Sequence, residues 1–210
     1  MRLHRRVQAV SAIQKRIHEA ALRLFAEKRI AEVNISELAQ SAGLARNTIY
    51  KNLESIDSLF EAVASDLSEE MNERVDRSAA PGLDPAQRTA NGIRFYIRRA
   101  HEEPHWGSFL VRYASSHDSL QRLWDGPPAR DALAGLASQR FDFRQEQLMS
   151  AVGMLAGSVL AAISLVLQGH KTWRDAGSDT AELVLRAWGV PPDEARRFAC
   201  EPLPVLPNLD

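Results

Sequence analysis

Apolar residues recur at intervals of three and four along most of the 210-residue chain, and this period limits the possible folds more than any other feature. Ile13, Ile17, Leu24 and Phe25 would form one such stripe on a helix. The alternating pattern of a half-buried strand does not occur. Segments rich in Gly, Pro and polar residues predict loops at 78–82, 126–128, 169–177, 189–192 and 202–207. The sequence therefore predicts an all-α protein of nine or ten helices.

Basic residues concentrate near the N-terminus. Residues 1–53 hold ten basic and four acidic residues, a net charge of +6, whereas residues 54–210 carry a net charge of −7. This asymmetry indicates a module that binds a polyanion, joined to a region with another role. The single cysteine, Cys200, excludes an internal disulfide and a zinc site built on several cysteines. The first residues have no apolar run typical of a secretory signal, so we expect a cytoplasmic protein.

Residues 34–53 predict two short helices joined by a tight turn. Asn34 is a suitable N-cap, and Glu37, three residues later, would complete a capping box. Gly43 can adopt the positive φ that ends the first helix, and the second helix would begin near Arg46. The inward side chains that would join the two helices are Leu38, Leu44 and Ile49. This arrangement is a helix-turn-helix.

The outward face of the second helix is polar and contains no acidic residue. Arg46 and Asn47 suit base edges, whereas Tyr50 and Lys51 suit phosphate oxygens. Backbone N–H groups at the start of the first helix would offer a further phosphate site. The candidate DNA-binding residues are Asn34, Ser36, Ala45, Arg46, Asn47, Thr48, Tyr50, Lys51 and Asn52.

Residues 35–53 resemble the DNA-binding region of the TetR (tetracycline repressor) family, and the similarity extends over about residues 13–63. The chain departs from the family pattern at three positions. The family usually has a hydroxyl residue at Ala45, Phe at Leu53 and a phosphate-contacting Lys at Ile56. These differences affect the expected affinity for DNA rather than the fold.

The resemblance implies a homodimer with an N-terminal three-helix DNA-binding domain and a C-terminal helical domain for effector binding and dimerisation. We place these domains at residues 1–55 and 56–210. Segments 155–163 and 182–189 are similar to the two dimer helices of the family. The expected interface residues are Val152, Leu155, Val159, Ile163, Val166, Leu183 and Leu185. We expect no catalytic site, cofactor or metal.

The resemblance also places an effector pocket among the middle helices, where large apolar side chains mix with a few polar ones. Such a mixture suits a small, largely apolar effector. The candidate pocket residues are Phe95, Arg98, Trp106, Phe109, Tyr113, Trp124, Phe141 and Met149.

These features predict a ligand-responsive transcriptional repressor that binds a palindromic operator in double-stranded DNA as a dimer. Two alternatives remain. Apolar residues 151–167 could anchor the chain in a membrane, although a spanning helix needs about 20 such residues. Residues 101–105 match the H-E-x-x-H pattern of zinc enzymes, but Pro104 would break the helix that the pattern needs. A dimer helix and a chance match are the favoured interpretations.

Overall fold

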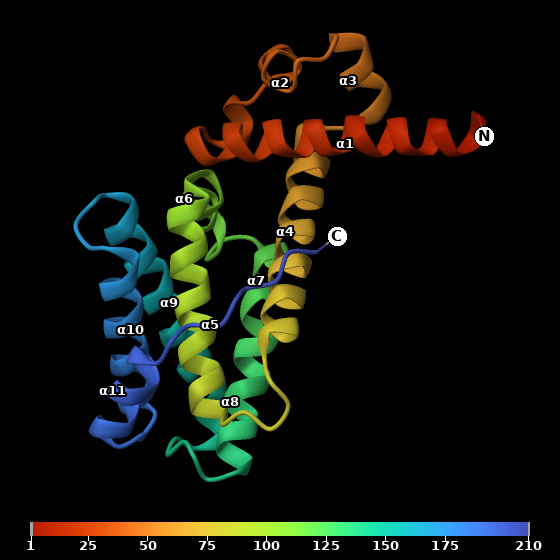
Figure 1. Ribbon diagram of the computed structural model, residues 1–210. Helices are drawn as coiled ribbons and strands as arrows, with labels where there is room; N and C mark the ends of the chain where they lie inside the picture. The colour runs from red at the N-terminus through yellow and green to blue at the C-terminus, as the bar shows by residue number, and fades with distance from the viewer. Residues whose placement is uncertain (1, 210) are drawn as a thin grey trace. The chain divides into compact units, whose positions relative to one another are not determined.

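The computed structural model describes the backbone of residues 2–209 and the side chains of residues 12–209. It divides into two compact units, Met1–Asp66 and Leu67–Asp210. Every regular element in the described residues is a helix, so the all-α prediction is confirmed (Figure 1). The division falls within helix α4 (Ile56–Ser78), later than the boundary expected after residue 55. The first part of α4 therefore belongs to the N-terminal unit.

The first unit contains α1 (Arg2–Glu27), the short 3₁₀ helix η1 (Ile30–Glu32), α2 (Ile35–Ala42), α3 (Arg46–Asn52) and the start of α4. Its core collects apolar side chains from all four α-helices. Ile17, Phe25, Leu38, Ile49 and Phe60 are among those exposed by 2% or less. The rings of Phe25 and Phe60 meet edge to face at 5.4 Å. This shared core connects α3 to the rest of the unit.

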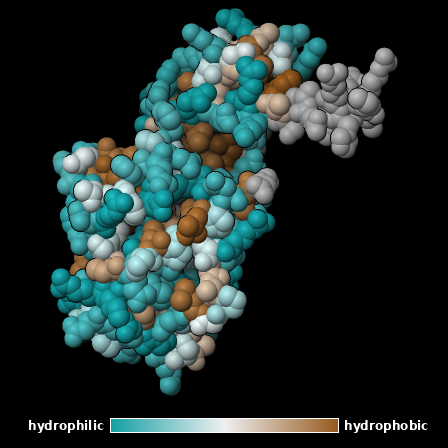
Figure 2. All heavy atoms as spheres, viewed as in Figure 1, coloured by the Kyte–Doolittle hydropathy of each residue, from teal (hydrophilic) through white to brown (hydrophobic). Residues whose placement is uncertain are grey.

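The second unit is built around α5 (Pro85–Glu102). This helix packs on α6 (Pro104–Tyr113), α8 (Pro127–Ala137), α9 (Leu148–Leu167), α10 (Trp173–Ala187) and α11 (Pro192–Cys200). Helix α7 (Asp118–Asp125) packs on α8, and the 3₁₀ helix η2 (Gln145–Gln147) precedes α9. In the view of Figure 2, hydrophilic residues predominate on the outside of this unit. Its apolar residues accordingly gather inside.

Local signals set the ends of α5. The Asp84 carboxylate accepts a hydrogen bond from the N–H of Ala86 at 2.8 Å, and Pro85 occupies the first turn. At the other end, Pro104 starts α6 after Glu103, whose φ of −126° and ψ of 77° interrupt the helix. The predicted helix break is confirmed, and the two histidines of the H-E-x-x-H match lie on different helices. No cluster of three potential metal ligands occurs among the described residues.

Two predicted loops are much shorter than expected. Of residues 126–128 only Gly126 lies outside a helix, because Pro127 begins α8. Residues 169–177 were expected to be a connection, but α10 already begins at Trp173. The reason is Thr172, whose hydroxyl oxygen accepts a hydrogen bond from the N–H of Asp175 at 3.1 Å and caps the helix. The described residues form eleven α-helices and two 3₁₀ helices, rather than nine or ten helices.

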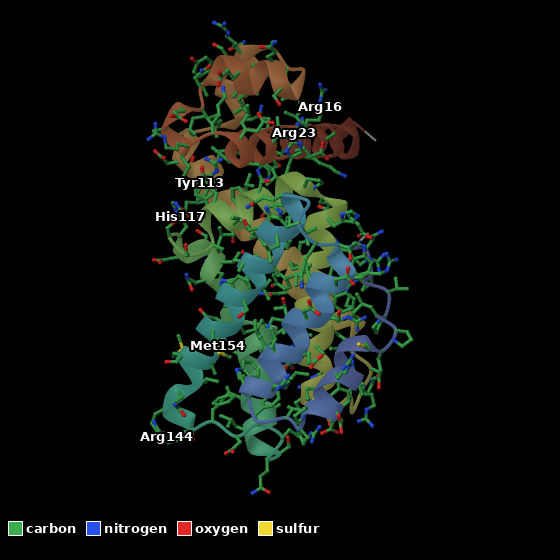
Figure 3. The ribbon with its side chains drawn as sticks, turned by 90° about the vertical axis from the view of Figure 1, so that its left-hand side faces the viewer. Arg16, Arg23, Tyr113, His117, Arg144 and Met154 are labelled. Atoms are coloured by element: carbon green, nitrogen blue, oxygen red, sulfur yellow. The ribbon has the colours of Figure 1, made fainter. Side chains whose placement is uncertain are left out.

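Helix α9 is the most apolar element. Among the described residues, the stretch Gln145–Leu167 is long and apolar enough to cross a membrane by length and composition. One side of α9 packs on α5, α6, α8 and α10 within the unit. The other side is exposed, and Met154 projects from it (Figure 3). Packing within the unit thus accounts for only one side of this helix.

Candidate DNA interface and effector cavity

The turn between α2 and α3 has the geometry that the sequence predicts. The side-chain oxygen of Asn34 accepts hydrogen bonds from the N–H groups of Ser36 and Glu37 at 3.0 and 3.1 Å. Gly43 has a φ of +62° and a ψ of +38°, and the N–H of Leu44 donates to the carbonyl of Ala39 at 2.9 Å. The N-cap and the left-handed glycine are therefore confirmed, and together they set the direction in which α3 leaves the turn.

Two arginines of α1 donate hydrogen bonds to the backbone of this turn, and the sequence analysis missed both. The Arg16 guanidinium donates to the carbonyls of Ala42 and Gly43 at 2.7 and 2.8 Å. Arg23 donates to the carbonyl of Ser41 at 3.3 Å, and Figure 3 shows both arginines on α1. A cation at the C-terminal end of α2 also opposes the negative end of the helix dipole. The seven-residue spacing of the two arginines, which places them on one helix face, was the available signal.

The predicted capping box forms only in part. The Glu37 carboxylate accepts a hydrogen bond from the ammonium of Lys28 at 2.7 Å instead of reaching back to the backbone of Asn34. This hydrogen bond raises the pKa of Lys28. Lys28, nine residues upstream, thus competes successfully for the carboxylate, and Glu37 joins α2 to the residue that follows α1.

Helix α3 presents a polar surface while one apolar side chain anchors it. Ile49 is fully buried, whereas Tyr50 is 65% exposed. Arg46, Asn47 and Lys51 are also exposed. These four residues occupy positions one, two, five and six of α3, and this spacing places them on one side of the helix. This surface contains no carboxylate that would repel a polyanion.

The remaining candidate DNA-binding residues are placed differently. Asn52 donates its side-chain amide to the carbonyl of Thr48 at 2.8 Å, and both residues are half-buried. Ala45 occupies the N-cap of α3 without a side-chain hydrogen bond, so the missing cap is confirmed. Asn34 is exposed but uses its side-chain oxygen as a cap, and Ser36 is half-buried. Contact of any of these residues with DNA stays a prediction.

The second unit contains two adjacent hollows, which we treat together as the two parts of a candidate effector cavity. An outer hollow of about 310 Å³ opens between the end of α4, the following loop, α5 and α8. An inner pocket of about 20 Å³ lies next to it, between α5, α7, α8 and α9. Val75, Arg88, Gly92 and Asp131 line both parts. The inner pocket has room for about one water molecule in this state.

The two parts differ in chemistry. The inner pocket is lined mainly by apolar and aromatic side chains, which include Ile93, Tyr96, Trp124, Leu155 and Val159. The rings of Tyr96 and Trp124 stack at 5.5 Å. Burial raises the pKa of Tyr96, so its hydroxyl stays protonated. A flat apolar group would find aromatic partners here.

The outer hollow carries an unusual carboxylate. Asp131 is 5% exposed and pairs with Arg88 at 2.8 Å. Burial raises the pKa of Asp131 to about 6, although Arg88 and Arg130 act to lower it. Among the described residues, the Nε of Arg88 and the hydroxyl of Thr89 are buried without a hydrogen-bond partner. Such unsatisfied groups in a cavity are candidate anchors for a ligand.

Only two of the eight expected pocket residues line this cavity. They are Phe95, in the outer hollow, and Trp124, in the inner pocket. Trp106, Phe109 and Tyr113 are buried in the core. Phe141 packs on Trp188 with ring centres 4.9 Å apart, Met149 is 73% exposed, and Arg98 lines a separate hollow. The sequence analysis missed Arg88 and Asp131, and no sequence pattern indicated the pair because the residues lie on different helices, α5 and α8.

The expected dimer-interface residues also need correction. Six of the seven lie inside the unit: Val152, Leu155, Val159, Ile163, Val166 and Leu185. Leu155 and Val159 line the inner pocket. Leu183 alone is exposed, at 62%. The exposed side of α9 consists instead of Gly153, Met154, Gly157, Ala161 and Leu165, and these residues alternate at the three- and four-residue spacing of one helix face.

Comparison with known proteins gives two family matches. Residues 17–63 match the bacterial regulatory proteins of the tetR family, and residues 84–200 match the tetracyclin repressor-like C-terminal domain. An HTH-type transcriptional regulator of Mycobacterium tuberculosis is 28% identical over 89 residues. That match spans 42% of this chain and 44% of the relative.

Solved structures show the same fold over nearly the whole chain. The crystal structure of RolR in complex with its ligand resorcinol is 30% identical, with a TM-score of 0.71. The match covers 96% of this chain and 100% of RolR. A TetR-like transcriptional regulator from Rhodococcus sp. RHA1 is 19% identical, with a TM-score of 0.66 over 83% of this chain and 94% of that one. On the two family matches and the likeness to RolR, the chain belongs to the TetR family of bacterial regulatory proteins.

Proposed function

We propose that the protein is a transcriptional repressor that binds an operator through α3. The observation that carries this proposal is the exposed surface of Arg46, Asn47, Tyr50 and Lys51, which has no carboxylate and stands on a firmly held turn. A recognition helix of this kind enters the major groove of DNA. Arg46 and Asn47 lie at the start of α3, where residues of a recognition helix meet base edges.

A dimer would use the exposed face of α9, defined here as Gly153, Met154, Gly157, Ala161 and Leu165, together with Leu183 of α10. Small residues at 153, 157 and 161 would let a second copy of α9 approach closely. A hollow of about 370 Å³ lies on this surface between α9 and α10, and a side chain of the second copy would fill it. Burial in a dimer explains an apolar helix that its own unit covers on one side only. Two copies would then bind a palindromic operator.

The effector would be a small hydroxylated aromatic molecule bound in the two-part cavity. Tyr96 and Trp124 suit an aromatic ring, and the hydrogen-bonding groups of Arg88, Thr89 and Asp131 suit hydroxyl groups. RolR, which shares 30% identity with this chain, binds resorcinol. Resorcinol itself is therefore the first compound to test.

Effector binding would require the cavity to change shape. The inner pocket holds about 20 Å³, too little for an aromatic ring, so a ligand must favour a state in which α5, α8 and α9 stand further apart. Val75 of α4 lines both parts of the cavity, and α4 continues into the DNA-binding unit. A change at this wall could thus alter DNA binding without any contact between effector and DNA.

The test is selection of bound sequences from a random pool of double-stranded DNA, followed by a mobility-shift assay with the selected sequence. Wild type should enrich a palindrome, and replacing Arg46, Tyr50 and Lys51 together by Ala should weaken binding by at least about 100-fold. A double Ala variant at Arg144 and Arg197, two exposed arginines of the second unit, is the control and should bind normally. Unchanged binding by the triple variant would contradict the assignment of α3.

The proposal differs in its expected outcomes from the two alternatives, a membrane anchor and a zinc enzyme. We expect a cytoplasmic protein without catalytic activity that remains in the supernatant when a detergent-free lysate is centrifuged at high speed. Recovery in the membrane pellet would favour an anchoring role for residues 151–167 instead.

A further inference from the structure

A second open hollow, of about 680 Å³, lies between α5, α10, α11 and the first residues after α11. None of its lining residues lines the effector cavity. Arg94 and Arg98 of α5 and Arg174 of α10 line it, together with His101 and Trp173. Three guanidinium groups around one hollow are a concentration of hydrogen-bond donors that suits an anion.

Arg94 lies beside α10, and one of its guanidinium nitrogens has no hydrogen-bond partner among the described residues. A Cβ added at Gly177 would lie 3.4 Å from the Cγ of Arg94, an ordinary van der Waals distance, so the stem of this side chain runs next to α10. The Nη1 of Arg94 is buried, and no hydrogen-bond acceptor reaches it from the described residues. Burial also lowers the pKa of Arg94. A buried donor without an acceptor is rare in folded proteins and points to a group that binds there.

Each carboxylate of the hollow has a nearby partner of its own, although the charge of Glu201 also acts on Arg94. Glu102 pairs with Arg98 at 2.8 Å. Asp175 accepts a hydrogen bond from the Thr172 hydroxyl at 2.7 Å, and Glu201 lies 4.0 Å from Arg197. Within the described side chains, Arg94 and Arg174 therefore have no carboxylate in ion-pair contact. The hollow keeps two guanidinium groups available for an external anion.

Trp173 orients two of the arginines. Its ring lies 5.5 Å from the guanidinium carbon of Arg98 and 4.5 Å from that of Arg174. These cation–π contacts restrict the flexible side chains without using their N–H donors. The order of Arg98 and Arg174 lowers the entropy that a bound anion would otherwise cost.

We propose that this hollow is a second ligand site that binds a small oxyanion, a carboxylate or a phosphate, through Arg94 and Arg174. The planar guanidinium groups donate paired N–H bonds to either kind of oxyanion. The proposal does not depend on DNA binding or on the effector cavity, because no lining residue is shared with either site.

The sole cysteine provides a reporter for this site. Cys200 is exposed and lines the hollow. Its reaction is followed with an anionic disulfide, 5,5′-dithiobis(2-nitrobenzoate), and with a neutral one, 4,4′-dithiodipyridine. A cationic hollow should favour the anionic reagent, and Arg94→Gln should lower the ratio of the two rates by about three- to tenfold. Inorganic phosphate and benzoate are then added separately at constant ionic strength.

Saturable protection of Cys200 by phosphate or by benzoate supports the site, and the more effective anion identifies the class of ligand. This protection should be lost in Arg94→Gln and in Arg174→Gln, of which the second changes an exposed residue and does not disturb the core. Arg186→Gln, at an exposed position of α10 outside the hollow, is the matched control and should keep the protection. Absence of protection by both anions, or equal protection in the Arg94 and Arg174 variants, would overturn the proposal.

Discussion

The two candidate sites are built in opposite ways. The DNA-binding surface of the first unit is convex, and its four exposed side chains come from the seven residues of α3. The candidate effector cavity of the second unit is concave, and its lining extends from Val75 to Val159 across α4, α5, α7, α8 and α9. A convex surface needs one well-anchored helix, whereas a cavity needs several helices in a fixed arrangement. The first site is thus a local property, and the second is a property of packing.

The same difference separates two exposed surfaces. On α3, polar residues face outward and Ile49 faces the core, so composition and exposure agree. On α9, both sides are apolar, and exposure is set by the positions of the neighbouring helices, because Met154 and Leu165 are exposed as well as the small residues. Large side chains such as Leu155 and Ile163 are buried, while Gly153, Gly157 and Ala161 remain outside. A substitution on the exposed side of α9 can therefore test the proposed dimer face without disturbing the core.

The largest expected effect is the loss of operator binding when the proposed dimer is broken. Ala161→Glu places a charge on the exposed face of α9, where a second copy would bring a like charge close to the symmetry axis. We expect a monomer in sedimentation analysis. Operator binding should weaken by at least about 100-fold, because a single half-site supplies only part of the binding energy.

The control is Ala137→Glu, at an exposed alanine near the end of α8 that is not on the proposed face. This variant should remain dimeric and bind the operator. A dimeric Ala161→Glu protein with normal operator binding would show that α9 does not form the interface.

The second prediction concerns the anchored turn of the first unit. Gly43→Val forces a β-branched residue into a positive φ, and its Cβ would lie 2.9 Å from the Nη2 of Arg16. Backbone strain and displaced Arg16 hydrogen bonds together should lower the free energy of unfolding by about 3–4 kcal/mol. Chemical denaturation measures this loss.

A helical glycine with free space provides the contrast. Gly92 has no atom within 4 Å of an added Cβ, so Gly92→Ala should raise stability by about 0.5–1 kcal/mol. If both glycine variants lowered stability equally, the loss at Gly43 would not be specific to the geometry of this turn.

Local signals allowed accurate prediction of several helix ends. Asn34, Gly43, Asp84 and Pro104 act through their own backbone or that of the next few residues, so their roles follow from sequence order alone. Contacts between distant residues were not predicted. The clearest case is Arg74, which is 9% exposed and donates to the carbonyl of Pro207 at 2.9 Å. In Figure 1 the C-terminal tail runs across α5 toward α4, and no sequence pattern indicated this path.

The effector cavity shows why composition alone fails for a concave site. Aromatic side chains predict a buried region, but Trp106 and Phe109 fill the core while Trp124 lines the pocket. The distinction depends on which neighbours leave space. The charged pair of Arg88 and Asp131 was overlooked because the two residues lie on different helices, α5 and α8.

The third prediction tests this pair through pH. The pKa of Asp131 is about 6 in the folded protein and 3.8 in its ordinary state, so between these values only the folded protein keeps the proton. Unfolding therefore releases a proton, and stability falls as pH rises from about 4 to 6. The loss from this group should be about 2–3 kcal/mol.

Urea denaturation of wild type and Asp131→Asn across this pH range isolates the contribution, because other titrating groups affect both proteins. The stability of the variant relative to wild type should rise with pH by the stated amount. A constant difference would mean that Asp131 ionises normally and that its surroundings are more open to water than the structure indicates.

The smallest expected effect is a gain at the start of α3. Ala45 occupies the N-cap without a side-chain hydrogen bond, so Ala45→Ser should supply a hydroxyl acceptor for a free N–H and raise the free energy of unfolding by about 1 kcal/mol. Ala31→Ser, at an exposed position that is not an N-cap, should change stability little and serves as the control. Denaturation measures the gain, and a mobility-shift assay shows whether the better cap also tightens operator binding.

Because the cap is a local feature, the gain should be the same in the monomeric Ala161→Glu background. A gain that required the dimer would mean that the recognition helix depends on the second unit for its own stability, which the shared core of Ile17, Leu38 and Ile49 argues against.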